Sequence, residues 1–576
     1  MQGTGIQQGE QPDVEFVDRA DEAHAPRLLL GPLLRYVDDT SATVWVETSQ
    51  PCRVEILGSA TTTFQVRSRH YALVVIEGLE PGSATEYVVT LDDARVWPEF
   101  DSSFPPSLIR TSAPGSDVSV LFGSCRAAAP HEPPYTLELT LDDEGRGVDS
   151  LWAHAMRMTS EPPERWPHLL LLVGDQIYAD DSSPRAKDRI ESIRGADSDL
   201  PSEIVASFEE YCWLYHEAWS APHERWLLST VPSAMIFDDH DMIDDWNISE
   251  AWVTDIRSQP WWQRHAIDGL MSYWIYQHLG NLSPAEIRKE GLLEQLLAEQ
   301  DGTAVLEKWA GTSEEFTPIP GGYRFSYTRR VGDVTVVVID CRNARVLNAG
   351  ARQMVGDEEW NWIRSEALAA DGDLILATSV PVFIADGLHD LQLWNERVCD
   401  GAWGRTAARW GEKLRRALDL EDWSAFSDSY QKFVALVDDL RSKDDPLRSI
   451  VVASGDIHFS YAAQLPRQDR NDSRVWQVVS SPIRNALIPP ERGVMRSTLT
   501  PLGARIGDLL RRSVRARRTR PGIDMTAGPF FANNMCELHF RGNEVELVIE
   551  QAAPNDNDEP ELHQVANVLL SGGTTS

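Results

Sequence analysis

The chain has 576 residues, of which 42% are hydrophobic and 25% charged, a composition typical of a globular protein with more than one domain. Its formal net charge of −36 at pH 7 argues against long-range attraction to nucleic acid or to an anionic membrane surface. It does not exclude a small anionic ligand such as a phosphate ester, because bound multivalent cations can reverse the charge at a site.

The spacing of the cysteines and the N-terminal residues indicate in which cellular compartment the protein resides. The six cysteines are scattered with no CxxC pair, so neither a disulfide framework nor a zinc ribbon is expected. The first residues carry no basic region, no apolar core and no twin arginine, and no stretch approaches about 18 apolar residues. We therefore expect a cytoplasmic protein without membrane insertion, or a secreted one if a signal segment has been removed.

The first part of the chain predicts a small β domain. Residues 1–27 are polar and acidic, and we interpret them as a flexible leader. Residues 28–112 contain short alternating runs at 42–47, 52–57, 71–76 and 85–91, separated by turns, which predict an antiparallel β-sandwich. Within it, Leu79, Pro81 and Tyr87 follow the order seen at the tyrosine corner of immunoglobulin-like and fibronectin type III domains.

Residues 118–553 have a different pattern, typical of a layered α/β domain. Apolar runs that end in polar residues or turns predict strands buried on both faces, and helical stretches such as 209–219 and 358–370 lie between them. The runs are 119–125, 168–175, 233–239, 334–340, 374–379 and 450–456. Residues 536–550 predict a hairpin, and residues 554–576 a polar tail.

Chemically reactive side chains gather at the ends of the predicted strands, where open α/β sheets bind ligands. They are Cys125, Asp175 and Tyr178 of GDQIY, the acidic run DDHDMIDD at 238–245, and Asp456 and His458 of GDIH. Thiolate, phenolate, imidazole and carboxylate are the ligands that a ferric or zinc-like ion beside a harder cation requires. Two ions bridged by one aspartate could clamp a phosphoryl group and activate a water or hydroxide nucleophile.

With these residues in place, the sequence resembles the PhoD-like (alkaline phosphatase D) family of metallophosphoesterases. The matching pieces are FGSCR, GDQIYAD, FDDHDMIDDW, TSVPV and SGDIHFS, in the family's order, and the resemblance spans about residues 28–550. It implies a layered α/β/β/α domain after the sandwich. It also implies hydrolysis of phosphate mono- or diesters by a metal-activated water, without a covalent phosphoenzyme.

Carried over by position, the resemblance implies a ferric ion held by Cys125, Asp175, Tyr178 and His458, with Asp175 bridging to a second site. That second site, calcium in the family, would be completed by Asp245 and Asp456, with Asp238 in reserve; oxygen ligands suit such a hard cation. The family commonly has Asn at the position of Asp245, so this chain adds a negative charge there.

Four residues are candidates for contact with substrate. We expect His240 to act on the leaving-group oxygen and Asp239 to orient the His240 ring. We expect Arg126 and Arg342, each of which follows a strand end, to grip phosphate oxygens.

Two other functions and one basic segment remain open. Cys125 could be the nucleophile of a metal-independent hydrolase, or the protein could be a binding or adhesion protein with a structural metal. The seven arginines between Arg505 and Arg520 could form a lid that gathers an anionic substrate, but we favour a helix whose charges pair with the acidic surface.

Overall fold

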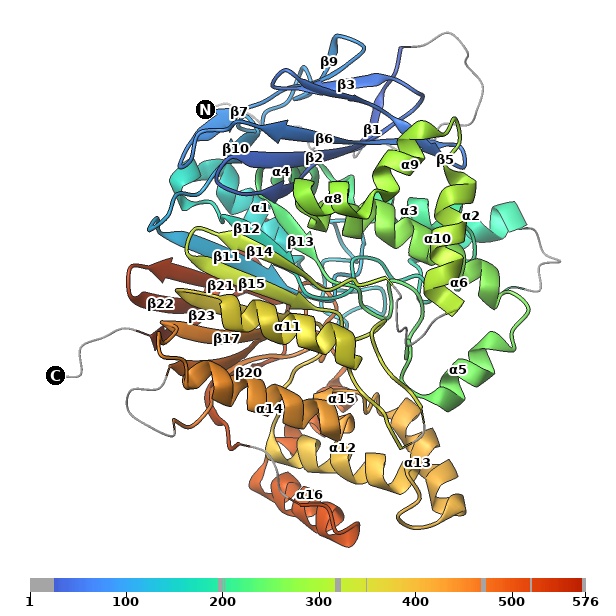
Figure 1. The fold of residues 1–576 in the computed structure, drawn as a ribbon, viewed down its shortest axis with the longest axis vertical. Helices are drawn as coiled ribbons and strands as arrows, with labels where there is room; N and C mark the ends of the chain where they lie inside the picture. The colour runs from blue at the N-terminus through green and yellow to red at the C-terminus, as the bar shows by residue number, and fades with distance from the viewer. Residues whose placement is uncertain are drawn as a thin grey trace.

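The computed structural model describes residues 25–194, 200, 203–315, 323–348, 350–467, 473–517 and 521–571. The expected leader lies outside the described residues up to position 24. The fold is mixed α/β, with a β-sandwich at one end and two large facing sheets flanked by helices below it (Figure 1). No helix among the described residues is long and apolar enough to cross a membrane.

The sandwich has two four-stranded sheets and a short pair of strands, β10-β7. The first sheet has the order β1-β2-β6-β5 and the second β4-β3-β8-β9. The strands are β1 (Leu28–Val37), β2 (Ser41–Thr48), β3 (Arg53–Ile56), β4 (Ser59–Thr62), β5 (Phe64–Val66), β6 (Arg69–Glu77), β7 (Ala84–Glu86), β8 (Val89–Leu91), β9 (Ala94–Trp97) and β10 (Leu108–Arg110). The expected run 85–91 is thus divided between β7 and β8.

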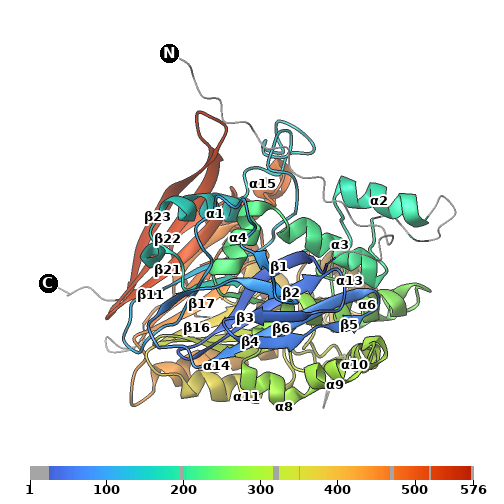
Figure 2. The same ribbon diagram turned by 90° about the horizontal axis from the view of Figure 1, so that it is seen from above.

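Strand β2 is buried along its whole length, which shows that the sandwich is packed on both faces of its first sheet. Val44 and Val46 point into the sandwich core, while Trp45 belongs to the core shared with the helices of the α/β domain. Seen from above, the sandwich strands lie across that helical layer (Figure 2). Tyr87, the tyrosine of the expected corner pattern, contacts the α/β domain, because its hydroxyl donates to the carbonyl of Ser229 in the helical layer, 2.6 Å away.

The α/β domain is built on two mixed sheets. The six-stranded sheet has the order β13-β12-β11-β21-β22-β23, and the seven-stranded sheet has the order β14-β15-β16-β17-β19-β18-β20. Their strands are β11 (Val118–Gly123), β12 (Leu169–Leu172), β13 (Ser233–Met235), β14 (Tyr327–Val331), β15 (Val334–Ile339), β16 (Asp373–Thr378), β17 (Ser449–Ser454), β18 (Ser460–Gln464), β19 (Arg474–Val479), β20 (Asp524–Phe530), β21 (Asn534–Arg541), β22 (Glu544–Pro554) and β23 (Pro560–Ser571).

The layers follow the order helices, sheet, sheet, helices. Apolar side chains from both sheets, such as Val120 and Val336, form one core between them. The outer face of the six-stranded sheet is covered by α1 (Ser150–Ser160), α3 (Phe208–Trp219), α4 (Pro222–Thr230) and α6 (Trp262–Tyr273). The outer face of the seven-stranded sheet is covered by α11 (Asp357–Ala369) and α14 (Ser427–Arg441).

The remaining helices lie around these layers. They are α2 (Pro184–Arg194), α5 (Glu250–Arg257), α7 (Leu279–Asn281), α8 (Pro284–Glu290), α9 (Leu292–Ala298), α10 (Thr303–Glu315), α12 (Asp386–Cys399), α13 (Arg405–Ala417), α15 (Pro489–Thr498) and α16 (Pro501–Ser513). The helices α12, α13 and α16 form a corner at the end of the molecule opposite the sandwich (Figure 1).

The prediction of a polar tail at residues 554–576 is wrong for most of that segment. The hairpin extends to Pro554, and residues 560–571 form β23, which pairs antiparallel with β22 at the edge of the six-stranded sheet. The outer face of β23 is exposed and polar, which made the segment look like a tail. Residues 572–576 lie outside the described residues.

Candidate metal centre

Loops from both sheets meet at the carboxyl ends of parallel strands. β11, β12 and β13 run parallel in one sheet, and β15, β16, β17 and β19 run parallel in the other. The residues that directly follow these strands therefore converge, as sequence patterns predicted. Cys125 follows β11, Asp175 follows β12, Asp238 follows β13, and Asp456 follows β17.

Ser124 links the loops that carry these side chains. Its hydroxyl accepts a hydrogen bond from the backbone N–H of Asp456 at 2.9 Å. A Cβ at Gly455 would lie 2.1 Å from the Ser124 hydroxyl oxygen, and one at Gly174 would lie 2.7 Å from the Ser124 Cβ. Each Gly-Asp pair thus needs its glycine, because the neighbouring loop approaches too closely for any side chain.

Backbone strain is concentrated in the same loops. Cys125, Asp456 and His458 have φ values of 58°, 66° and 54°, and Asp245 and Asn247 have φ values of 64° and 58°. Left-handed geometry costs a non-glycine residue about 1 to 3 kcal/mol, and it persists where the surrounding structure imposes it, often at functional sites.

Two overlapping groups of side chains could hold a metal ion. Ligand atoms of Cys125, Asp175 and Asp456 lie within 4.8 Å of one another, and so do those of Asp175, Asp238, Asp239 and Asp456. Asp175 and Asp456 belong to both groups, so either could serve two ions. The structure thus brings together three of the six expected ligands and adds two carboxylates of the acidic run.

Several carboxylate oxygens of this cluster lack a hydrogen-bond partner, which is the main sign that they serve a ligand. Both oxygens of Asp175 are buried without a partner, and so is one oxygen of Asp238. Burial and the negative charge of Asp238 raise the pKa of Asp175 well above its ordinary value. Isolated buried carboxylates are costly unless they are paired or coordinate a metal, so the residues present fit bound cations.

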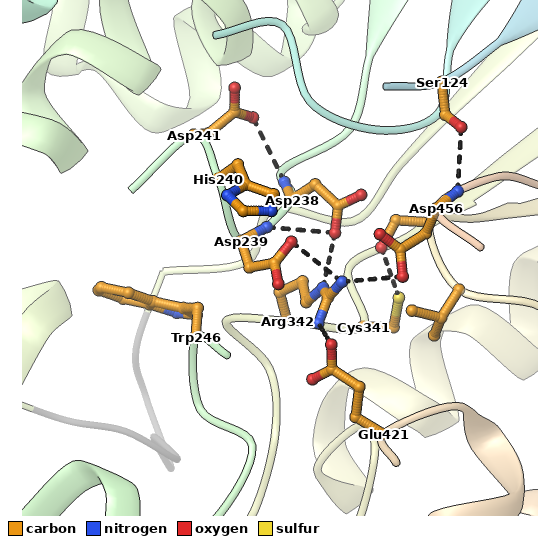
Figure 3. Close-up of polar contacts among 12 residues, drawn as sticks. Ser124, Asp238, Asp239, His240, Asp241, Trp246, Cys341, Arg342, Glu421 and Asp456 are labelled. Atoms are coloured by element: carbon orange, nitrogen blue, oxygen red, sulfur yellow. Dashed lines mark hydrogen bonds and ion pairs between the residues drawn. The ribbon is translucent and has the colours of Figure 1, made fainter. Parts of the chain in front are cut away.

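Arg342 lies in the middle of the acidic cluster rather than facing a phosphate as expected (Figure 3). Its Nε lies 2.6 Å from Asp238, and its Nη2 lies 3.1 Å from Asp239 and 3.2 Å from Asp456. Its Nη1 pairs with Glu421. The side chain is completely buried, so the guanidinium holds the carboxylates in position and has no exposed edge for substrate.

The expectation that Arg126 grips phosphate is also wrong. Its guanidinium bonds Asp149 at 2.8 Å, Glu224 at 3.0 Å and the Ala218 carbonyl at 2.6 Å, and the residue is 4% exposed. These partners belong to the helical layer. Arg126 therefore ties the loop after β11 to α1 and α4 and points away from the acidic cluster.

His240 is oriented by Asp180 rather than by Asp239. Its Nδ1 lies 2.8 Å from the Asp180 carboxylate, whereas Asp239 pairs with Arg342. Burial opposes the charged ring, but the charges of Asp180 and Asp175 outweigh it and raise the pKa of His240 well above its ordinary value. The side chain is 25% exposed, so a protonated ring remains in reach of a ligand.

A cleft of about 690 Å³ opens beside the cluster, and its walls include two of the expected ligands but none of the clustered acids. Tyr178 and His458 line it, together with Asn485, whose side chain donates to the Tyr178 hydroxyl at 3.0 Å. Burial and the charges of Asp175 and Cys125 raise the pKa of Tyr178 well above its ordinary value. Burial and the positive charge of His240 lower the pKa of His458 to about 4, so that its ring is neutral and able to ligate.

Asp245 is not brought together with Asp456 as expected. Among the described residues, no group of candidate ligand atoms within 4.8 Å includes Asp245. Burial and the charges of Glu421, Asp244 and Asp419 raise the pKa of Asp245 to about 9. Asp238, and not Asp245, belongs to the second group of candidate ligands.

The geometry does not favour Cys125 as a nucleophile. Its side chain is fully buried, and burial together with the charges of Asp175 and Asp456 raises the pKa of the thiol well above its ordinary value. A nucleophilic cysteine needs the opposite setting, with a base or positive charge that stabilises the thiolate.

Two of the residues that complete the site were missed from the sequence. Asp180 stands two positions after Tyr178 in GDQIYAD, so strand-like spacing could have placed both side chains on one side. Glu421 follows α13 in an irregular segment, and no sequence pattern marks it.

Comparisons with known proteins place this fold. A family model described as a domain of unknown function (DUF7800) matches residues 25–109, which is the sandwich. A search of curated proteins found no match. Among solved structures, one titled "Structure of PhoD" matches with a TM-score of 0.54 and 12% identity over 96% of this chain and 94% of that chain. The chain therefore has a PhoD-like fold.

Proposed function

We propose that the protein hydrolyses phosphate mono- or diesters at a dinuclear metal centre. The observation that carries the proposal is Asp175, whose two carboxylate oxygens are buried without a partner between Cys125 and the other acidic side chains. The fold shared with the PhoD structure and the order of the strand-end motifs support the same function.

Cys125, Asp175, Tyr178 and His458 would hold a ferric ion, and Asp175, Asp238 and Asp456 a second, divalent cation, for which calcium is the expected choice. One oxygen of Asp238 is buried without a partner, which supports Asp238 as a ligand of the second cation. Asp245 would change the charge beside this cation without binding it. Bound ions of this kind supply Lewis-acid polarisation of a phosphoryl oxygen and an activated water.

The protein's own residues would position the substrate and provide a proton. The cleft admits an ester, and its rim carries Arg185, Lys187 and Arg492 as anion-binding side chains. Asp180 keeps His240 protonated through Nδ1, so that Nε2 can donate to the leaving-group oxygen. Arg342 would keep the carboxylates in place while the charge of the cluster changes.

The test is hydrolysis of bis-p-nitrophenyl phosphate, with elemental analysis, in wild type and Asp175→Asn. We expect iron to fall below a tenth of the wild-type content in the variant and hydrolysis to drop by about a thousandfold, because one bridging ligand supports both ions. Chelation of the wild type should have the same effect, and adding metal back should reverse it.

Asp188→Asn is the matched control, since it removes an exposed carboxylate on α2 that does not line the cleft. It should keep its metal and its activity. Hydrolysis by Asp175→Asn at the wild-type rate, or hydrolysis that survives complete metal removal, would refute the proposed function.

A further inference from the structure

The orientation of α16 is fixed by glycines. α16 packs against α12, where a Cβ at Gly507 would lie 2.9 Å from the Gly387 carbonyl oxygen, and it meets the end of α15, where a Cβ at Gly503 would lie 2.4 Å from the Ser497 carbonyl oxygen. A Cβ at Gly387 would in turn lie 2.9 Å from the Gly503 backbone. Because only glycine fits where the two helices touch, α16 cannot rotate to bury another face.

The outward face of α16 is apolar and basic. Leu502, Ile506 and Leu509 are 65%, 51% and 66% exposed and follow one another at helical spacing. Arg505 and Arg512 are exposed on the same face, and the one acidic residue of the helix, Asp508, is less exposed and pairs with Arg511 and Arg512. An amphipathic helix normally turns its apolar face toward the protein core, whereas the apolar face of α16 points toward solvent.

The charges of this segment are only partly paired, which corrects the expectation that they pair with the acidic surface. Arg511 contacts Asp508 and Asp390, but Arg505, Arg515 and Arg517 form no ion pair with any described residue. Arg518 and Arg520 lie outside the described residues. The segment therefore carries an excess of positive charge at the edge of a strongly acidic chain.

One aromatic side chain extends the patch. Trp403 is 49% exposed and donates through Nε1 to the carbonyl of Ser513 at the end of α16, at 3.4 Å. Tryptophan and arginine are the residues that favour the boundary between water and lipid.

We propose that α16 docks the protein on an anionic lipid surface, with Leu502, Ile506 and Leu509 inserted among the acyl chains and the arginines on the lipid phosphates. α16 lies at the periphery of the molecule (Figure 1), and its outward face is both apolar and basic. A partner of complementary charge must offer an apolar layer directly beneath negative charge, as an anionic lipid surface does. The net charge of −36 argues against long-range attraction to such a surface, but salt screens charges beyond about 8 Å, so the positive charge of this segment acts at contact.

Docking is independent of the proposed hydrolysis and is tested by vesicle sedimentation with the full chain. Wild type should sediment with vesicles of phosphatidylcholine and phosphatidylglycerol, but not with phosphatidylcholine alone, and high salt should release it. Replacing Leu502, Ile506 and Leu509 with Gln should lower the partition coefficient at least about tenfold. Replacing Arg505, Arg515 and Arg517 with Gln should remove the preference for phosphatidylglycerol.

The matched control replaces Leu57, Leu297 and Leu569 with Gln, three leucines exposed on other parts of the surface, and should bind vesicles like wild type. All variants change exposed side chains, so their thermal melting and their hydrolysis of a soluble ester should match wild type. Equal binding to both vesicle types, or binding unchanged in the α16 leucine variant, would refute the proposal. So would self-association in ultracentrifugation that disappears in that variant without vesicle binding, since the patch would then join two copies.

Discussion

Two clusters of buried charge in this protein have opposite hydrogen-bonding patterns. Between the sandwich and the helical layer, Glu47 bonds Arg69 at 2.6 Å, His216 at 2.8 Å and the Tyr276 hydroxyl at 2.9 Å, so both of its oxygens are used. At the strand ends, Asp175 is just as buried and neither of its oxygens has a partner. A carboxylate that holds the fold is satisfied by the protein itself, whereas one that serves a ligand is left open for it.

Breaking the satisfied cluster should have the largest effect on stability. Glu47→Ala removes the buried carboxylate that Arg69 and His216 share and leaves Arg69, among the described residues, only its ion pair with the more exposed Glu209, so it should lower the free energy of unfolding by about 3 to 5 kcal/mol. Urea denaturation followed by tryptophan fluorescence measures this loss. Glu55→Ala removes a partly exposed partner of Arg53 on a sandwich strand and should cost at most about 1 kcal/mol. Equal losses of unfolding free energy in the two variants would show that the buried cluster stabilises the fold no more than a surface ion pair.

Acid should weaken the same cluster. Burial alone would raise the pKa of Glu47, but His216 and Arg69 outweigh it and lower the pKa from 4.5 to about 2. Because the folded pKa is the lower one, the stabilisation of about 3 kcal/mol is complete above pH 4.5 and is lost as the pH falls toward about 2. Glu47→Gln should lack this pH dependence, so its stability difference from wild type should shrink over that range.

At the strand ends, Asp180→Asn should affect activity rather than stability. His240 would lose the carboxylate on its Nδ1, its pKa would fall, and the protonated ring would disappear at lower pH. We expect kcat to drop about ten- to a hundredfold and the alkaline limb of its pH profile to move to lower pH. A drop in kcat with an unshifted profile would mean that Asp180 only supports the fold.

We expect the smallest effect on stability from the hydrogen bond between Tyr87 of the sandwich and Ser229 of the helical layer. Tyr87→Phe removes one buried hydrogen bond to the Ser229 carbonyl and should lower the free energy of unfolding by about 1 kcal/mol without changing hydrolysis. Thermal unfolding by calorimetry measures it. A large loss of activity would show that the sandwich contributes to the site.

The sequence predicted the buried strands well, and it led us to expect the proximity of Cys125, Asp175 and Asp456. Apolar runs that end in Gly-Asp or in cysteine are typical of buried strands whose ends carry ligands. That these residues bind metal stays a prediction.

The sequence failed for β23, whose polar outer face hides an edge strand, and for partners that meet only in three dimensions. Nothing near Arg126 indicates that Asp149 and Glu224 surround it, and nothing near Arg342 indicates Glu421. Such pairings depend on how distant loops fold back, which local patterns do not encode.

The bond between Ser124 and the backbone of Asp456 joins positions 332 residues apart. A ribosome synthesises the chain from its N-terminus, so Cys125 and Asp175 emerge long before Asp456 and His458. The nascent chain can therefore fold its sandwich and first strands while the candidate metal centre still lacks Asp456 and His458. Metal loading of the kind proposed would thus have to wait until these residues have emerged, and a chain truncated before Asp456 would lack a complete centre.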